Sequence, residues 1–402
     1  MTKKRILLLI ADAGYGHRSA AQAIIAALAD YPDVEAEVHN PLDGEDVPAV
    51  IRKSQYQYDK FVQNMPELYQ QAYEASDIPI VNSLVESVAT VALYDILRRT
   101  VKAKQPDGIV IPYPYYQAPL AAYFSLSETS IPLMTVVTDL ATVHRAWFNP
   151  VSDLCVVPTA IVAGLAQESG LPMDKVKTIG IPVHPDFGRT YDQAALRQRL
   201  GWATDKTVIL AVGSDRVSNI PRMLQPVNHA NLDVEMALVA GGNDELYAEF
   251  QQTEWHQPTH IYNFVENMPQ LMAAADCIVC KAGGLIVTEA LAAGLPLLLV
   301  DVIEGQETGN AAFVIDANAG AHVTEPTELL ETVYHWIQDG QLPTKQSYAR
   351  QAGQPHAAKE IAKLAYELVS QNQPSSDAVK QLDNNSILDL FARFGVDTEA
   401  SR

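Results

Sequence analysis

Two adjacent glycines, Gly283 and Gly284, separate a short apolar run from a segment with helical character at 285–294. Backbone amides at the start of a helix can approach a diphosphate closely where no side chain intervenes. Glu289 falls in the second turn of that helix, and a carboxylate there can accept hydrogen bonds from both hydroxyls of a ribose. The spacing therefore predicts a site for a nucleoside diphosphate.

A second polar loop, 304–310, follows the next apolar run at 297–300. Gln306, Glu307 and Asn310 lie in this loop, and their amide and carboxylate groups suit hydrogen bonds with several sugar hydroxyls. Ordinary loop polarity would explain one such residue, but it explains the ordered set in both loops poorly. Together the two loops predict a sugar nucleotide as the ligand.

A turn with two glycines, Gly14 and Gly16, joins the first apolar run to a helix expected at 17–29. The spacing does not match G-x-G-x-x-G, which disfavours a nicotinamide dehydrogenase. Amides at this helix start favour an anionic or polar ligand. His17 is a candidate general base because its unperturbed pKa suits that role. The alternative is a histidine that only caps or packs at the helix start.

A third polar loop, which includes Asp139, combines an acid, a histidine, an arginine and two aromatic side chains. Asp139 can orient His17 or contact the acceptor of a transfer reaction. Gly16, His144 and Trp147 are expected on the same acceptor side. For each residue of this loop the alternative is structural, namely a helix cap or a packed aromatic corner.

Apolar strand-like runs alternate with helical segments along the chain, which predicts parallel sheets with helical crossovers. Five runs are expected in the first half, at 5–11, 34–40, 108–111, 133–138 and 154–157. Five more are expected in the second half, at 207–212, 234–240, 260–262, 276–280 and 297–300. Ligands of such sheets bind at the carboxyl ends of the strands, where the three loops lie.

Two prolines and two glycines within nine residues, 180–188, indicate a stiff connector between two domains. We therefore expect an α/β protein with Rossmann-like domains at 1–183 and 184–345. A C-terminal helix is expected at 346–370, packed back on the first domain. A linker and a short terminal helix are expected at 371–402.

The composition is that of a globular protein, with 402 residues, 48% hydrophobic and 19% charged. The formal net charge of −20 disfavours nucleic acid as a partner and makes any membrane contact local and apolar. The stretch 50–103 is mostly helical and rich in tyrosine, which suits a bilayer interface or a lipid-tail groove. The alternative is a helix pair that packs on its own sheet.

The three cysteines give no disulfide framework, and Cys277 and Cys280 are interpreted as ordinary core residues of a strand. The apolar run at 6–11 is too short for an export signal. We expect a cytoplasmic protein, peripheral on the inner face of the cell membrane where it contacts one. No Asp-x-Asp sequence occurs, so neither a catalytic metal nor another cofactor is expected.

Five ordered segments carry a resemblance to a known family, at 14–20, 137–140, 144–149, 180–183 and 305–307. From about residue 5 to 340 the chain resembles the monogalactosyldiacylglycerol synthases and the processive diacylglycerol glucosyltransferases. The resemblance implies the GT-B fold, two Rossmann-like domains whose parallel sheets face a central cleft. It also implies inverting transfer of a hexose from a UDP-sugar, held by the C-terminal domain, to a lipid such as diacylglycerol on the N-terminal domain.

The resemblance also implies roles for single residues. His17 matches the family's proposed catalytic histidine, which would deprotonate the acceptor hydroxyl in a single displacement at the anomeric carbon. The donor-binding positions, for uracil, ribose, diphosphate and sugar, are Phe264, Val265, Gly213, Glu289, Gly283, Gly284, Gln306, Glu307 and Asn310. The turn at 213–219 departs from the family's glycine-rich pattern because it has a single glycine, and Ile286 replaces a common threonine.

Three alternatives to a lipid glycosyltransferase stay open at this stage. One is a glycosyltransferase with a non-lipid acceptor. Another is an isomerase similar to a UDP-N-acetylglucosamine 2-epimerase, which would need further acid and base groups and no acceptor. The third is a non-catalytic protein that binds a sugar nucleotide, which the altered turn at 213–219 favours and the intact His17 disfavours.

Overall fold

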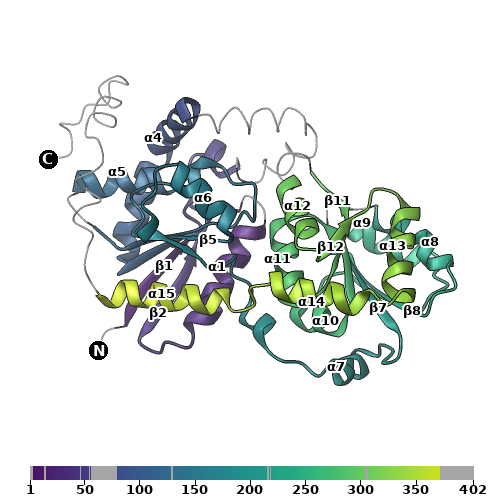
Figure 1. Cartoon of the computed structure of the whole chain (residues 1–402). Helices are drawn as coiled ribbons and strands as arrows, with labels where there is room; N and C mark the ends of the chain where they lie inside the picture. Colours follow the sequence, from purple (N-terminus) through teal and green to yellow (C-terminus); the bar gives the residue numbers. More distant parts are fainter. Residues whose placement is uncertain are drawn as a thin grey trace. The chain divides into compact units, whose positions relative to one another are not determined.

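The computed structural model in Figure 1 is described in nine stretches of the chain, 3–12, 15–45, 47–53, 55, 79–127, 130–214, 217, 219–303 and 307–371. The chain divides into two compact units. Unit 1 comprises Met1–Asp139, Val143–Pro182 and Ala357–Arg402, and unit 2 comprises Leu140–Thr142 and Val183–His356. Gln306, the aromatic residues of 56–78 and the tail after residue 371 lie outside the described residues.

Unit 1 is built on a parallel six-stranded sheet in the order β2-β1-β3-β4-β5-β6. Its strands are β1 (Lys4–Leu9), β2 (Val34–His39), β3 (Gly108–Ile111), β4 (Leu133–Val136), β5 (Leu154–Val157) and β6 (Val176–Thr178). Its α-helices and 3-10 turns are α1 (Tyr15–Leu28), η1 (Pro41–Asp43), α4 (Pro79–Lys104), α5 (Gln117–Ser127), η2 (Arg145–Trp147), α6 (Ala160–Glu168), η3 (Met173–Lys175) and α15 (Ala357–Gln371).

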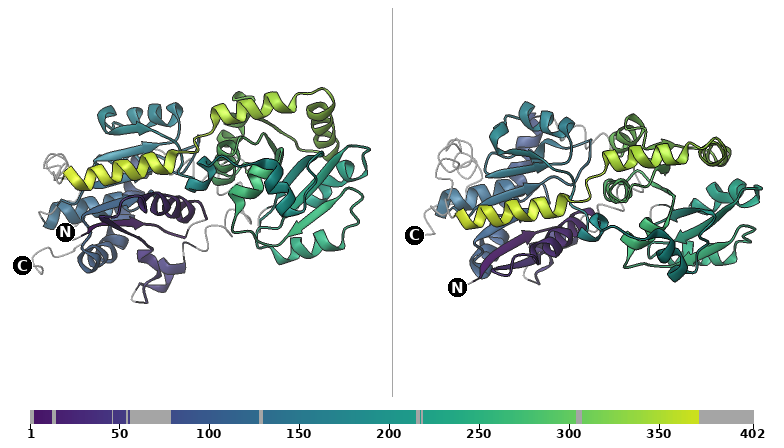
Figure 2. Two further views of the ribbon diagram at one scale, coloured as in Figure 1. Left: turned by 90° about the horizontal axis from the view of Figure 1, so that it is seen from below. Right: turned by 60° about the horizontal axis from the view of Figure 1, so that its bottom comes forward.

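The two faces of the unit 1 sheet carry different helices because side chains alternate along each strand. Ile6 and Leu8 of β1 pack with α1 and α15 on one face. Leu7 and Leu9 pack with α4 and α5 on the other. Figures 1 and 2 show α15 beside α1, although the two helices come from opposite ends of the chain.

The C-terminal region contains two helices, α14 (Leu342–Ala352) and α15, where one helix was expected at 346–370. Gly353 ends the first of them in an extended conformation, and a Cβ there would stand 2.1 Å from the Leu291 carbonyl oxygen. Pro355 follows, and proline disfavours helical backbone in the residue before it. Tyr366 of α15 then stacks on Tyr31 with ring centroids 4.5 Å apart, which fastens this helix to unit 1.

Unit 2 is built on a second parallel six-stranded sheet, in the order β12-β11-β10-β7-β8-β9, the doubly wound Rossmann order. Its strands are β7 (Thr207–Val212), β8 (Val234–Val239), β9 (Thr259–Tyr262), β10 (Cys277–Lys281), β11 (Leu297–Asp301) and β12 (Gly320–His322). Its other elements are η4 (Pro185–Gly188), α7 (Gln193–Leu200), α8 (Ile220–His229), α9 (Asp244–Gln252), α10 (Met268–Ala274), α11 (Gly284–Ala292), α12 (Thr308–Asp316), α13 (Pro326–Gln338) and α14.

The expectation of two α/β units with parallel sheets is confirmed. The sequence analysis missed β6 and β12, which have three residues each and are too short to show a periodic pattern. Cys277 and Cys280 are both buried free thiols in β10, as expected of core cysteines. Burial raises the pKa of both thiols, so neither is set up as a nucleophile.

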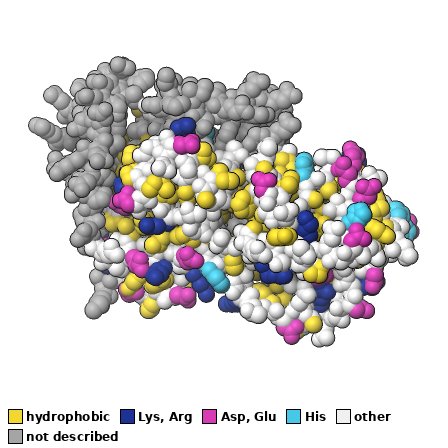
Figure 3. Space-filling model, viewed as in Figure 1, with side chains coloured by type: hydrophobic (Ala, Val, Ile, Leu, Met, Phe, Trp, Pro, Cys, Tyr) yellow, Lys and Arg dark blue, Asp and Glu magenta, His cyan; other side chains and the backbone are white. Residues whose placement is uncertain are grey.

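Acidic and basic side chains are interspersed on the face of the molecule shown in Figure 3. The net charge of −20 is therefore not gathered into separate acidic and basic regions on that face. Within the described part of the chain, none of the helices combines the length and the apolar character that crossing a bilayer requires.

Candidate active site

Each sheet has a point at which the strand order reverses, and ligands of open α/β sheets bind at the carboxyl ends of the strands there. In unit 1 this point lies between β1 and β3, and in unit 2 between β7 and β10. The β1–α1 turn follows the first of these points. The β10–α11 turn and the turn after β7 follow the second. The candidate residues of the sequence analysis fall on these turns and their neighbours.

His17 lies in the first turn of α1, among aromatic side chains from two other loops of unit 1. Its Nδ1 is 3.0 Å from the Thr138 hydroxyl, and its ring meets Tyr113 edge-on at 5.3 Å and Trp147 at 6.1 Å. Desolvation lowers the pKa of His17 to about 4, although a hydrogen bond with the backbone of Pro112 and the charge of Asp12 oppose the shift. The ring is therefore neutral at pH 7 and free to take up a proton.

Asp139 accepts a hydrogen bond from the indole Nε1 of Trp147 at 2.7 Å. Burial raises the pKa of Asp139 to about 6, and the indole hydrogen bond opposes part of that shift. Trp147 is 1% exposed, and its ring is the one that borders His17. Asp139 thus acts on the His17 site through the indole that it orients.

His144 lies at the start of η2 and is buried. Its Nδ1 accepts a hydrogen bond from the amide of Ala146 at 3.1 Å, which caps the turn. Through this contact His144 stabilises the loop that carries Trp147. Gly16 lies in the first turn of α1, beside His17, with nothing within 4 Å of the place where a Cβ would stand.

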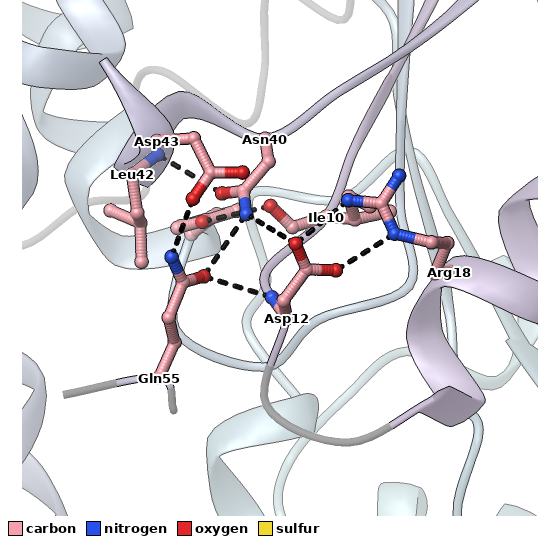
Figure 4. Close-up of polar contacts among 8 residues, drawn as sticks. Ile10, Asp12, Arg18, Asn40, Leu42, Asp43 and Gln55 are labelled. Carbon is pink, nitrogen blue, oxygen red and sulfur yellow. Dashed lines mark hydrogen bonds and ion pairs between the residues drawn. The ribbon is translucent and has the colours of Figure 1, made fainter. Parts of the chain in front are cut away.

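A polar network that the sequence analysis missed closes the base of the β1–α1 turn (Figure 4). Arg18 donates two hydrogen bonds to the carboxylate of Asp12, from Nε at 2.8 Å and from a terminal nitrogen at 2.7 Å. Asn40, which follows β2, donates to the same carboxylate at 3.1 Å. These contacts connect the end of β1 to the start of α1, and His17 is the residue next to Arg18.

Gln55, in the segment that follows η1, hydrogen-bonds with this network, as Figure 4 shows. Its Oε1 accepts from the amide of Asp12 at 2.9 Å and from the Asn40 side chain at 3.0 Å. Its Nε2 donates to Asp43 at 2.8 Å. Gln55 is 3% exposed, so every polar atom of its side chain is both buried and paired.

The two glycines of unit 2 lie where the sequence analysis expected them. Gly283 is the N-cap of α11, and Gly284 is its first residue. No side-chain cap covers the amides at this helix start. Such amides carry partial positive charge and suit a diphosphate.

Glu289 lies in the second turn of α11 and is partly buried. Desolvation raises its pKa to about 8. Its carboxyl group makes no hydrogen bond or ion pair with any residue of the described stretches. A carboxyl group without a protein partner can accept hydrogen bonds from a ligand, and the hydroxyls of a ribose are suitable donors.

Glu307 and Asn310 lie at the start of α12 and are buried at 4% and 6% exposure. One carboxylate oxygen of Glu307 accepts from the Lys281 ammonium at 3.1 Å, and the other accepts from the Ile303 amide at 3.2 Å. Asn310 donates to the carbonyl oxygen of Ala282 at 2.9 Å. These contacts join the loop after β11 to the loop after β10.

Phe264 and Val265 follow β9 directly, and the Phe264 ring is 69% exposed. An exposed aromatic ring beside free backbone suits a nucleobase. Gly213 follows β7, and Ser214 and Val217 beyond it pair in an antiparallel bridge.

Residues 17–183 match the family model of the monogalactosyldiacylglycerol (MGDG) synthases, and residues 207–367 match that of the glycosyltransferase family 28 C-terminal domain. The chloroplastic monogalactosyldiacylglycerol synthase of Spinacia oleracea is 30% identical over 382 residues, which cover 92% of this chain and 73% of that protein.

Two solved structures share the architecture. MurG of Acinetobacter baumannii has a TM-score of 0.60 at 15% identity, over 90% of this chain and 99% of that one. The UDP-GlcNAc 2-epimerase from Neisseria meningitidis, bound to UDP-GlcNAc, has a TM-score of 0.56 at 14% identity, over 90% and 100%. At such low identity these likenesses establish the fold and not the activity.

The two Rossmann-like units, the bare helix start at Gly283 and the family 28 match define a glycosyltransferase of the GT-B class. The chain belongs to the monogalactosyldiacylglycerol synthase family, to which the identity with the spinach enzyme and the match over 17–183 both assign it. The isomerase and the non-catalytic binding protein are accordingly not favoured.

Proposed function

We propose that this glycosyltransferase transfers a hexose from a UDP-sugar to diacylglycerol with inversion at the anomeric carbon. The observation that carries the proposal is the relationship to the synthases, whose names specify a monogalactosyl group on diacylglycerol. Galactose is accordingly the first sugar to test. The UDP moiety is supported by the helix start at Gly283 and by the unpartnered carboxyl group of Glu289.

On the acceptor side, His17 takes the proton of the lipid hydroxyl as that oxygen attacks the anomeric carbon. Its ring is neutral at pH 7, so it is in the right form to act as a base. Its pKa of about 4 already includes the charge of Asp12, which partly offsets the desolvation that lowers it. Asp139 holds the Trp147 indole that borders the ring.

On the donor side, negative charge builds up on the diphosphate as the sugar leaves. The amides at Gly283 and Gly284 are fixed before the reaction, so they stabilise the transition state more than the ground state. We propose that this arrangement serves without a metal ion. The helix amides supply the partial positive charge that a metal ion would otherwise provide.

We also propose that the enzyme is peripheral on the inner face of the cell membrane, where a lipid acceptor would be available. Exposed apolar side chains on α4 and α5 support such a contact, since Val88 is 60% exposed and Val91 and Leu126 are each 46% exposed. The acidic net charge makes an electrostatic attraction to anionic lipid unfavourable. Apolar insertion is the remaining means of binding.

The proposal is tested by incubating the protein with single UDP-sugars and vesicles that contain diacylglycerol, with and without EDTA. We expect a monohexosyl diacylglycerol by mass spectrometry and an inverted anomeric configuration by NMR, unchanged by EDTA. A product on a non-lipid acceptor, or free hexose only, would contradict the acceptor class.

A further inference from the structure

The space beside Gly283 is occupied by the side chain of Lys281. A Cβ at position 283 would stand 2.8 Å from Cε of Lys281, 3.2 Å from its Nζ and 3.5 Å from a carboxylate oxygen of Glu307. Glycine at this position leaves room for the end of the Lys281 side chain, which lies beside the start of α11 and toward Glu307.

Glu307 depends on that lysine for its charge balance. The Glu307 carboxylate is nearly inaccessible to solvent, and the Lys281 ammonium at 3.1 Å is its cationic partner. A buried carboxylate that loses its cation is destabilised, because nothing repays its removal from water. Burial raises the pKa of the nearby Asp301, the charge of Glu307 raises it further, and Lys281 opposes the shift.

The backbone of the two loops is joined at the same place. The amide of Ala282 donates to the carbonyl oxygen of Asp301 at 2.9 Å, and Asn310 donates to the carbonyl oxygen of Ala282 at 2.9 Å. The ion pair between Lys281 and Glu307 thus connects the loop assigned to the diphosphate with the loop assigned to the sugar.

We infer that Lys281 is a positioning residue for the donor sugar, because it holds the Glu307 carboxylate toward the hexose hydroxyls. The inference rests on the proposed function, in which Glu307 contacts the sugar. A carboxylate has about four lone-pair sites, and the contacts with Lys281 and Ile303 use two of them. The remaining sites can accept sugar hydroxyls in a direction that Lys281 sets.

The test measures two quantities for the Lys281→Met variant. One is the Kd for UDP, and the other is the KM for the complete UDP-sugar. We expect the KM for the UDP-sugar to rise about tenfold or more, while the Kd for UDP stays within about twofold of wild type. Lys281→Arg keeps the cation and should recover most of the loss. Lys206→Met is the matched control. Lys206 lies just before the first residue of β7 and pairs with Asp233 at 3.2 Å, whereas Lys281 is the last residue of β10.

A double variant shows whether Lys281 acts through Glu307. In the Glu307→Gln background, K281M should change the KM by no more than about twofold. An equal effect in both backgrounds, an unchanged KM in the single variant, or a parallel loss of UDP affinity would each overturn the inference. The last result would place Lys281 on the diphosphate instead.

Folding of the variant and the proposed function are checked separately. If K281M does not fold, Lys281→Gln is used, because its shorter, uncharged side chain cannot replace the ammonium that pairs with Glu307; we expect it to raise the KM without changing the Kd for UDP, and a KM equal to wild type would overturn the inference. Failure of the wild-type protein to bind UDP would instead refute the proposed function.

Discussion

The β1–α1 turn of unit 1 and the β10–α11 turn of unit 2 both lie where the strand order of a parallel sheet reverses, but they are held in different ways. Side chains from three segments close the first, with Asp12 at the centre and Gln55 behind it. Among the described residues, backbone contacts, the Asn310 side chain and the ion pair of Lys281 with Glu307 hold the second.

The difference follows from what each turn can do. The first presents a desolvated histidine, whose basicity depends on nearby charges and on a fixed ring position. The second presents helix amides, which bind an anion only if no side chain covers them. The same topological position thus carries the proposed base in unit 1 and the proposed anion site in unit 2.

The largest difference between the effect on transfer and the effect on UDP binding is expected from His17→Ala. Loss of a general base typically costs about 10²–10⁴-fold in rate, and UDP does not need this residue. We therefore expect transfer to fall by at least about 10²-fold while UDP affinity by calorimetry is unchanged. His335→Ala, at an exposed histidine of unit 2, is the control. Activity within a few-fold of wild type would remove His17 from the mechanism.

Glu289→Ala, in contrast to His17→Ala, should weaken UDP binding. Loss of hydrogen bonds between a carboxylate and the ribose hydroxyls should weaken UDP binding by about 1–3 kcal/mol. Glu289→Gln keeps an acceptor oxygen and should lose less. Calorimetric titration with UDP measures both variants. A dissociation constant equal to that of wild type in E289A would show that the ribose lies elsewhere.

The raised pKa of Glu289 predicts a pH dependence of UDP binding. The free protein holds the proton below about pH 8, whereas the ribose hydroxyls favour the ionised carboxylate, so binding releases a proton. UDP affinity should therefore rise with pH, by up to about tenfold per unit, and level off above about 8. E289Q corrects for titration of UDP itself, and an equal slope in that variant would exclude Glu289.

Gln55→Leu tests the support of the unit 1 turn. It removes the hydrogen bonds of Gln55 with the Asp12 amide, the Asn40 side chain and Asp43, which should cost about 1–3 kcal/mol of stability. Transfer should fall a few-fold because His17 is less well positioned, and UDP affinity should be unchanged. Urea unfolding and calorimetry measure these effects against Gln351→Leu, an exposed control. A parallel loss of UDP affinity would indicate general damage.

The smallest effect is expected from Val88→Glu with Val91→Glu on α4. If these exposed side chains enter a bilayer, charge there should reduce flotation with neutral vesicles by several-fold and leave soluble UDP binding intact. Ile161→Glu, at a comparably exposed residue of α6, is the control. Binding that instead rises with anionic lipid and vanishes with salt would indicate a basic patch.

The alternation of apolar and polar segments was enough to predict two α/β units and most of their strands. It did not predict the break at Gly353, where the backbone of Leu291 leaves no room for a side chain. The role of Gln55 was also not predicted, since a glutamine beside a tyrosine-rich stretch of sequence carries no distinctive local signal. The partners that explain such a residue lie elsewhere in the chain.

By itself the sequence determined the turns at Gly16 and Gly283 and the residue types beside them, because glycine placement and helix starts depend on near neighbours in the chain. The tertiary structure decided their chemistry. It set the pKa of His17 near 4 and that of Glu289 near 8 through burial. It also brought Gln55 to Asp12 across 43 residues and Lys281 to Glu307 across 26. Desolvation and ion pairing depend on what surrounds a side chain in space, and only the packed fold specifies that environment.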